Sequence, residues 1–437
     1  MASQFDQDAA RAEKIQESQN GQSSIDIKDT FPAVEKVGET TFPEGGARAW
    51  AVAAGTAGIL FTTFGYVNAF GVYQEYYSTH QLQDHTPSDI SWIGSLQAFS
   101  LFGGALFGGP LFDRYGAKVI WPAAVSYVFS IFMTSICKEY YQFMLAQGIL
   151  GGISTGMVMA PAVACTSQYF HKNRGAAMGM AIGGSSVGGV VFPIALSKML
   201  YNPNLSFGWI VRIIGFLILT VLGISCIPIR ARLPPRKGTF FIAAAFRNYQ
   251  FLSIVGSTFL AMLGVFIPIF YLPSYAVSYG MDPLLASYLV AILNGASFFG
   301  RVIPGILADR VGRLNGLFVA CISTGILILC WQAVRSNAAI IVFAAIYGFC
   351  SGAIVSLMSV ALTQVPTDPR EIGTYMGMGM CITAFAVLIG PPINGALVAR
   401  YGGFEQVSIF SGVVVIVGGL SVLFAKHASG KGVFGKV

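Results

Sequence analysis

Two short stretches of this sequence decide its fold. Residues 109–116 read Gly-Pro-Leu-Phe-Asp-Arg-Tyr-Gly, and residues 305–312 read Gly-Ile-Leu-Ala-Asp-Arg-Val-Gly. Both follow the pattern G-x-L-x-D-R-x-G, and they begin 196 residues apart. Smaller matches recur at nearly the same spacing: Ser154-Thr-Gly156 with Cys350-Ser-Gly352, Arg174 with Arg370, and Met178-Gly179 with Met376-Gly377. A parallel internal repeat of this kind predicts two similar halves within one chain.

The composition places both halves in a membrane. The chain has 437 residues, of which 54% are apolar and only 10% are charged, and its mean hydropathy is +0.67. Soluble domains carry about 25% charged residues, and a helix needs about 20 apolar residues to cross a bilayer. We therefore expect an all-α membrane protein with twelve transmembrane helices in two pseudo-symmetric six-helix bundles. The predicted spans are residues 50–73, 89–112, 118–137, 141–169, 175–200, 208–229, 251–277, 284–308, 315–334, 338–365, 371–399 and 404–425.

Charge and loop length divide the rest of the chain. The first 48 residues are polar, with few aromatic residues, which is typical of a disordered segment. The longest internal loop separates six spans from six. The predicted organisation is a disordered cytoplasmic arm (1–48), an N-terminal bundle (49–229), a cytoplasmic linker (230–250), a C-terminal bundle (251–425) and a cytoplasmic tail (426–437).

The distribution of Lys and Arg predicts the orientation. Loops on the side of the two termini carry twelve of these residues, from Arg114 to Arg370, whereas the opposite loops and their margins carry five. The positive-inside rule then places both termini in the cytoplasm, and we expect a monomeric, multi-pass protein of the plasma membrane. The sequon at Asn204 falls on the outer side and is a candidate glycosylation site. The net charge of +7 is spread over short loops, which favours contact with acidic lipid over nucleic acid.

Several motifs resemble those of a known family of carriers. The two repeated loops resemble the signature of the major facilitator superfamily. The stretches Pro43–Trp50 (PEGGARAW), Phe64–Gly71 (FGYVNAFG) and Tyr169–Gly179 (YFHKNRGAAMG) are similar to the monocarboxylate porter family, particularly its fungal members. The resemblance covers roughly residues 43–425. It implies the major facilitator fold and a substrate that is a monocarboxylate, a vitamin or an acidic secondary metabolite.

This sequence departs from the animal-type members of that family at two positions. Where they carry a lysine in the first span, this chain has Asn68, and where they carry an aspartate in the eighth span, it has Ser297. The arginine of the eighth span is present as Arg301. The resemblance therefore points to these three residues as lining the substrate site, with one cation and no acid.

Arg301 is the candidate anchor for the substrate. It lies in the middle of the eighth span, where a charge costs about 2.5–3.5 kcal/mol unless it faces a cavity or a partner. Its planar fork suits a carboxylate, although an arginine bonded to helix carbonyls is the structural alternative. Asn294, two turns before it on the same span, is a further candidate for substrate binding. Tyr271, between Pro268 and Pro273, is the fifth candidate substrate residue, placed at an outer gate; anchoring of an aromatic ring at the interface explains it equally well.

The ends of the spans hold the remaining candidates. The resemblance implies that Asp113, Arg114, Asp309, Arg310 and Arg313 brace the two halves in one state of the cycle. Topogenic charge and helix capping explain the same residues without a gating role. All 19 Asp and Glu residues lie in the arm, the loops or the span ends, so no acid is expected near Arg301 to carry a proton.

These observations predict a secondary transporter of a small organic anion that works by alternating access. Export of an acidic secondary metabolite in a biosynthetic pathway is one direction, and uptake of a nutrient monocarboxylate or vitamin is the other. A non-transporting nutrient receptor on the same fold is the alternative from another class, against which the short tail argues. We expect no metal, no cofactor and no enzymatic activity, since we find no P-loop and no cluster of catalytic residues in the spans.

Overall fold

The computed structural model describes residues 42–234 and 240–429, which consist there of helices and connecting turns without any strand. The helices of residues 42–234, the first half, are α2 (Gly46–Thr62), α3 (Phe64–Val67), α4 (Phe70–Thr79), α5 (Pro87–Tyr115), α6 (Ile120–Thr134), α7 (Tyr140–Phe143), α8 (Gly152–Tyr169), α9 (Arg174–Leu200) and α10 (Phe207–Cys226). Those of residues 240–429, the second half, are α11 (Tyr249–Ser278), α12 (Pro283–Val311), α13 (Arg313–Cys330), α14 (Asn337–Thr363), α15 (Ile372–Tyr401) and α16 (Glu405–Ala428). A π-helix, Met144–Gly151, connects α7 to α8.

Eleven helical segments of the described residues are long and apolar enough to cross a membrane. One of them, Ser88–Thr134, has 47 residues and contains two of the predicted spans. These are α5 and α6, which a single turn at Gly116 joins; its φ of 68° favours glycine. Each of the twelve predicted spans therefore falls largely within a helical segment, and the prediction of an all-α membrane fold is confirmed.

The N-terminal boundary differs from the prediction. We assigned residues 1–48 to a disordered arm, but α2 begins at Gly46 and Glu44 is hydrogen-bonded to the turn before α9. Residues 42–48 therefore pack on the helices. Residues 1–41 of the predicted arm, 235–239 of the linker and 430–437 of the tail lie outside the described residues.

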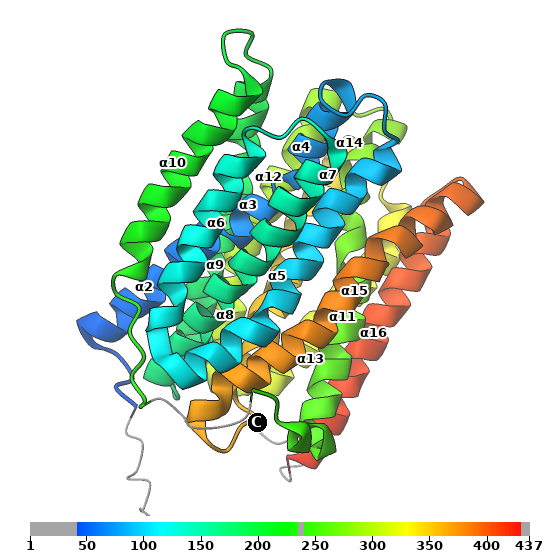
Figure 1. Ribbon diagram of the computed structural model, residues 1–437. Coiled ribbons are helices and arrows are strands. Elements are labelled where there is room, and N and C mark those ends of the chain that lie inside the picture. Colours follow the sequence, from blue (N-terminus) through cyan, green and yellow to red (C-terminus); the bar gives the residue numbers. More distant parts are fainter. Residues whose placement is uncertain (1–41, 235–239, 430–437) are drawn as a thin grey trace, which may run out of the picture. The chain divides into compact units, whose positions relative to one another are not determined.

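Two pairs of helices join the two halves. Helix α5 packs along α15, and α9 packs along α12 (Figure 1). Glycines allow the backbones to approach at both crossings: a Cβ on Gly109 would overlap the carbonyl group of Gly373, and one on Gly175 would overlap that of Gly305. The two pairs occupy equivalent places in the repeat, as the pseudo-symmetry predicts. Small residues thus let the helices approach closely at both crossings.

The first span is broken in its middle. Helix α2 ends at Thr62, α3 has only four residues, and α4 begins after Asn68 and Ala69. A broken helix leaves backbone groups without intrahelical partners, which must be satisfied inside the protein. The Thr62 carbonyl accepts a hydrogen bond of 2.7 Å from the Tyr127 hydroxyl of α6. Phe64 begins α3 and Asn68 directly follows it, so both residues lie at the interruptions of the span.

Helix α10 shows how the outer surface suits lipid. Its side chains Phe216, Leu219 and Ile224 are exposed, whereas Ile214, Ile218 and Leu222 are buried. A surface of large apolar side chains over 20 residues is stable where the surrounding solvent is hydrocarbon.

Candidate functional site

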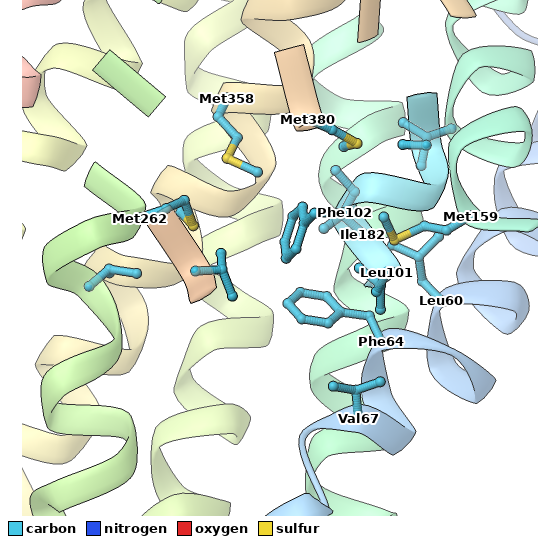
Figure 2. Packing of buried hydrophobic residues seen from close by; sticks show 14 of the residues in the cluster. Leu60, Phe64, Val67, Leu101, Phe102, Met159, Ile182, Met262, Met358 and Met380 are labelled. Atoms are coloured by element: carbon cyan, nitrogen blue, oxygen red, sulfur yellow. The ribbon is translucent and has the colours of Figure 1, made fainter. Parts of the chain in front are cut away.

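A cavity lies between the halves at mid-span. The space between protein atoms there, open solvent included, is about 510 Å³. Residues of the broken first span, of α5 and of three helices of the second half line it: Phe64, Asn68, Phe102, Met262, Val265, Phe266, Ile269, Leu293, Asn294, Ser297, Arg301, Ser351, Gly352 and Val355. Figure 2 shows Phe64 beside Phe102, with Met262 on the opposite side. Most of the wall is apolar, and the polar groups gather around one cation.

That cation is Arg301 of α12, which is 4% exposed. Its Nη1 donates 2.9 Å to the Ile182 carbonyl and also bonds the Ser185 hydroxyl, both on α9 of the first half. The guanidinium carbon lies 5.9 Å from the centre of the Phe64 ring. Its Nε is buried and has no hydrogen-bond partner among the described residues. Part of the guanidinium therefore joins the two halves, while its Nε has no acceptor there.

The charge of Arg301 has no carboxylate opposite it in this cavity, since no Asp, Glu or His is among the lining residues. A buried charge without a counter-charge is costly, because the interior solvates it poorly. An unfilled donor on a buried cation in an apolar cavity is the arrangement that attracts an anion.

Two amides extend the polar wall. The Asn294 Nδ2 donates 3.0 Å to the Val290 carbonyl one turn earlier, which holds its Oδ1 towards the first half. A Cβ on Gly189 of α9 would lie 2.7 Å from that Oδ1 and 3.1 Å from the Nδ2 of Asn68. The two amides thus converge at Gly189. Ser297 faces the same cavity one helical turn before Arg301.

The structure thus brings four predicted substrate residues together, and leaves the fifth apart. Tyr271 is not among the lining residues; its ring lies 6.2 Å from that of Phe404. Helical periodicity explains the separation. The cavity face of α11 contains Met262, Val265, Phe266 and Ile269, and a residue two places beyond Ile269 points about 200° away from it.

At one end of the helices, two aspartates bond the halves to each other. Asp113, in the last turn of α5, accepts hydrogen bonds from the backbone N–H of Gly373 (3.1 Å) and Thr374 (2.6 Å) at the start of α15. Asp309, in the last turn of α12, accepts bonds of 2.9 Å from both Gly175 and Ala176 at the start of α9. We call these two contacts the latch and this end the closed end. Each carboxylate meets the positive end of a helix, where anions are favoured.

The arginines of the repeated loops differ in their contacts. Arg313 bonds Asp309 at 3.3 Å and donates to the His171 carbonyl of the first half, so it joins the latch. Arg114 is exposed, with its guanidinium carbon 5.3 Å from the centre of the Phe240 ring, and Arg310 is exposed. Neither faces the latch contacts described above.

Sequence reasoning missed two residues of the closed end. Arg174 is 4% exposed, and its Nη1 donates 2.9 Å to the Thr363 carbonyl of α14, across the two halves. Its match with Arg370 in the repeat was the available signal. Glu44 binds the turn before α9, and only its place in the PEGGARAW stretch singled it out. The apolar cavity residues carried no signal, because they look like any other residue of a span.

Asn204, the candidate glycosylation site, is exposed in the turn between α9 and α10, where its N–H bonds the Asn202 side chain at 3.0 Å. In the described part of the chain, no three His, Cys, Asp or Glu side chains are grouped so as to hold a metal ion.

An all-helical, two-part membrane protein with a polar cavity at mid-span, closed at one end by contacts between its halves, has the architecture of a solute carrier. A family model described as Major Facilitator Superfamily matches residues 50–335 and 254–435. The chain belongs to the Major Facilitator Superfamily.

Curated relatives match most of this chain. The aspyridones efflux protein apdF of Emericella nidulans is 55% identical over 391 residues, covering 90% of this chain and 80% of the relative. The agnestins efflux protein AgnL12 of Paecilomyces divaricatus is 41% identical over 385 residues, covering 87% of each chain. A crystal structure of the human organic anion transporter MFSD10 (TETRAN) superposes with a TM-score of 0.69 at 15% identity, covering 86% of this chain and all of that one. That likeness shows the shared fold.

Proposed function

We propose that this protein exports a small organic anion, an acidic secondary metabolite, by alternating access. The observation that carries the anionic substrate is Arg301: a buried cation in a largely apolar cavity, with an unpartnered Nε and no carboxylate in the lining. The acidic group would bind at Arg301, the two amides would contact polar substituents, and the phenylalanine rings would hold the apolar body. The relatives named as efflux proteins support export over uptake.

The latch supports alternating access. Its Asp309 contact joins the halves at the end of α12, eight residues beyond Arg301, which is about 12 Å along a helix. The halves would separate at this end and close at the other during transport, and the carboxylates would release the helix ends. We place the closed end and both termini in the cytoplasm of a plasma-membrane protein, as the Lys and Arg distribution indicates. The motifs quoted above support a fungal member of the monocarboxylate porter family.

The test of the anionic substrate uses pairs of ligands that differ only in charge. Purified protein is titrated with a panel of lipophilic monocarboxylates and with the neutral amide of each, and the thermal unfolding midpoint is recorded. We expect the acids that bind to raise the midpoint and their amides to leave it unchanged, because binding to the folded state alone stabilises it. Arg301→Gln should abolish the difference between acid and amide, and Arg301→Lys should weaken it because the fork is lost.

Arg212→Lys is the matched control, since Arg212 of α10 lies outside the cavity lining and bonds Ser135 at 3.2 Å. That variant should keep the response to acids. Equal stabilisation by acids and amides, or an intact response in Arg301→Gln, would refute an anion site at Arg301. Export is tested separately: producing cells that lack the protein should retain the acidic metabolite, and unchanged retention would favour uptake.

A further inference from the structure

The turn that leads into α9 is held by a carboxylate that lies outside every span. Glu44 precedes α2 and accepts hydrogen bonds from three successive backbone N–H groups, those of His171 (2.9 Å), Lys172 (2.7 Å) and Asn173 (3.1 Å). The Asn173 side chain donates to the Glu44 carbonyl at 3.3 Å. Burial raises the pKa of Glu44, but the three amide donors together lower it by more, so the pKa lies below its ordinary value. The carboxylate is therefore ionised at neutral pH.

The backbone around Glu44 is shaped for this contact. Glu44 has a φ of 53°, the one positive φ of a non-glycine residue in the described part of the chain. A residue other than glycine, asparagine or aspartate rarely adopts this conformation, because it is strained. Phe42 anchors the same segment: its ring centre lies 5.1 Å from that of His171 and 5.1 Å from the guanidinium carbon of Arg232. We call residues 42–46 the strap.

The strap and the latch meet at one helix end. The amides of residues 171–173 bind Glu44 of the first half, and those of Gly175 and Ala176 bind Asp309 of the second half. The His171 carbonyl, between the strap and the latch, accepts a hydrogen bond from Arg313 of the second half. Fixing the turn at 171–173 therefore fixes the direction of the groups that Asp309 and Arg313 bind.

The other latch contact is built differently. At the start of α15, the turn is held by Asp368 of the same loop, which bonds the N–H of Arg370 at 2.9 Å. The turn before α15 thus has a supporting bond within its own loop. The turn before α9 is bonded to Glu44, which lies 127 residues before His171 in the chain.

We propose that Glu44 is a positioning residue for transport. By holding the turn before α9, it prepares the amides of Gly175 and Ala176 for Asp309, and so favours the state that is closed at this end. All the strap contacts named above are to the first half, so the strap would move together with that half. It would affect the latch only when the second half is in contact with the first at the closed end. The proposal rests on the latch as part of the transport cycle, and it is independent of the chemistry of the substrate.

Amide hydrogen exchange of the whole protein in detergent or nanodiscs tests it. We compare wild type with Glu44→Gln, Glu44→Asp and Asp309→Asn, and follow peptides that cover residues 171–176, the start of α15 and the middle of α16. In Glu44→Gln we expect about fivefold faster exchange at Gly175 and Ala176, as for the loss of a helix cap. We also expect faster exchange at Gly373 and Thr374, which Glu44 does not touch, because opening the closed end frees both latch contacts. Asp309→Asn should do the same, and Glu44→Asp should be intermediate.

The controls separate positioning from folding. Asp282→Asn removes a capping carboxylate of the same kind at the start of α12, where it bonds the N–H groups of Leu284 and Leu285; exchange at both latch contacts should be unchanged. Exchange in α16 should be unchanged in every variant. In the Asp309→Asn background, Glu44→Gln should add little at the start of α15, because the two changes act on one contact.

Two results would overturn the role of Glu44. Faster exchange confined to residues 171–173, with Gly175, Ala176 and α15 as in wild type, would make the strap a local support only. Additive effects of Glu44→Gln and Asp309→Asn at α15 would mean that the strap acts through another contact. If Asp309→Asn leaves exchange at the start of α15 unchanged, the two latch contacts are not coupled, and the proposed role of Glu44 is wrong. That result would not bear on the anion site at Arg301.

Discussion

At the scale of single residues, the guanidinium of Arg301 is hydrogen-bonded at one nitrogen and not at another. Its Nη1 bonds α9 at the Ile182 carbonyl and the Ser185 hydroxyl, which is the structural contact expected of an arginine in a span, and its Nε has none. Sequence reasoning treated the structural and the substrate-binding roles as alternatives. In the structure the two sides of one guanidinium can serve both, because the fork presents five donors in a plane.

Ser297 offers a test of how the charge of Arg301 is balanced. Replacing Ser297 by Asp places a carboxylate one helical turn from Arg301 in the same cavity. We expect weaker binding of anions, by about tenfold or more, because the arginine gains an internal partner. The pH profile of transport should become the same for substrates of different acidity, whereas in wild type it should follow the pKa of each substrate.

Ser287→Asp is the control for that substitution, since Ser287 is exposed near the start of the same helix. It should leave both affinity and pH profile unchanged. If Ser297→Asp behaves like Ser287→Asp, residue 297 does not interact with the group that binds the anion. If wild type already shows one fixed profile for all substrates, a titrating group of the protein takes part in transport.

At the scale of elements, the crossing of α5 and α15 depends on Gly109. A Cβ there would overlap the Gly373 carbonyl, so Gly109→Ala should push the two helices apart at the closed end. Overpacking of this kind costs about 1–3 kcal/mol. We expect a shift towards the state that is open at this end, measured as a longer distance between spin labels on α5 and α15, together with slower transport.

Gly103→Ala in the same helix is the matched control, because an added Cβ meets nothing within 4 Å there. It should leave the distance and the transport rate as in wild type. An unchanged distance in Gly109→Ala would mean that α5 and α15 accommodate the added methyl group without separating at the closed end.

The elements also show what the sequence could predict. Hydropathy and the repeat were sufficient for the helical spans, because length and apolar content depend on local sequence alone. The family resemblance pointed to Asn68, Ser297 and Arg301, and these residues line one cavity together with Asn294; their role in substrate binding stays a prediction. Tyr271 lies outside that lining, because packing decides which face of α11 meets the cavity. Hydropathy and the repeat gave no sign of the break after Thr62, whose carbonyl is satisfied by Tyr127 from another helix.

At the scale of the whole molecule, the orientation remains a prediction from charge. We expect tags at both termini to be accessible only after the membrane is permeabilised, and a cysteine-reactive, membrane-impermeant label to reach a cysteine placed at exposed Asn204 in intact cells. Labelling of residue 204 only after permeabilisation, with the termini accessible from outside, would reverse the orientation. The closed end would then face outwards.

The bonds between Arg301 and α9 have a pharmacological consequence. The cation expected to bind the substrate also bonds the opposite half, so in the proposed cycle those bonds would have to break and re-form whenever the halves tilt. Consider a rigid anion that binds the guanidinium but is too wide to allow α9 and α12 to change their angle. Such an anion would bind and prevent the conformational change. Such a compound would compete with substrate from the side it entered, and would block release on the other side without competing there. The type of inhibition should therefore differ between the two sides of the membrane, and the kinetics would show from which side the inhibitor had entered.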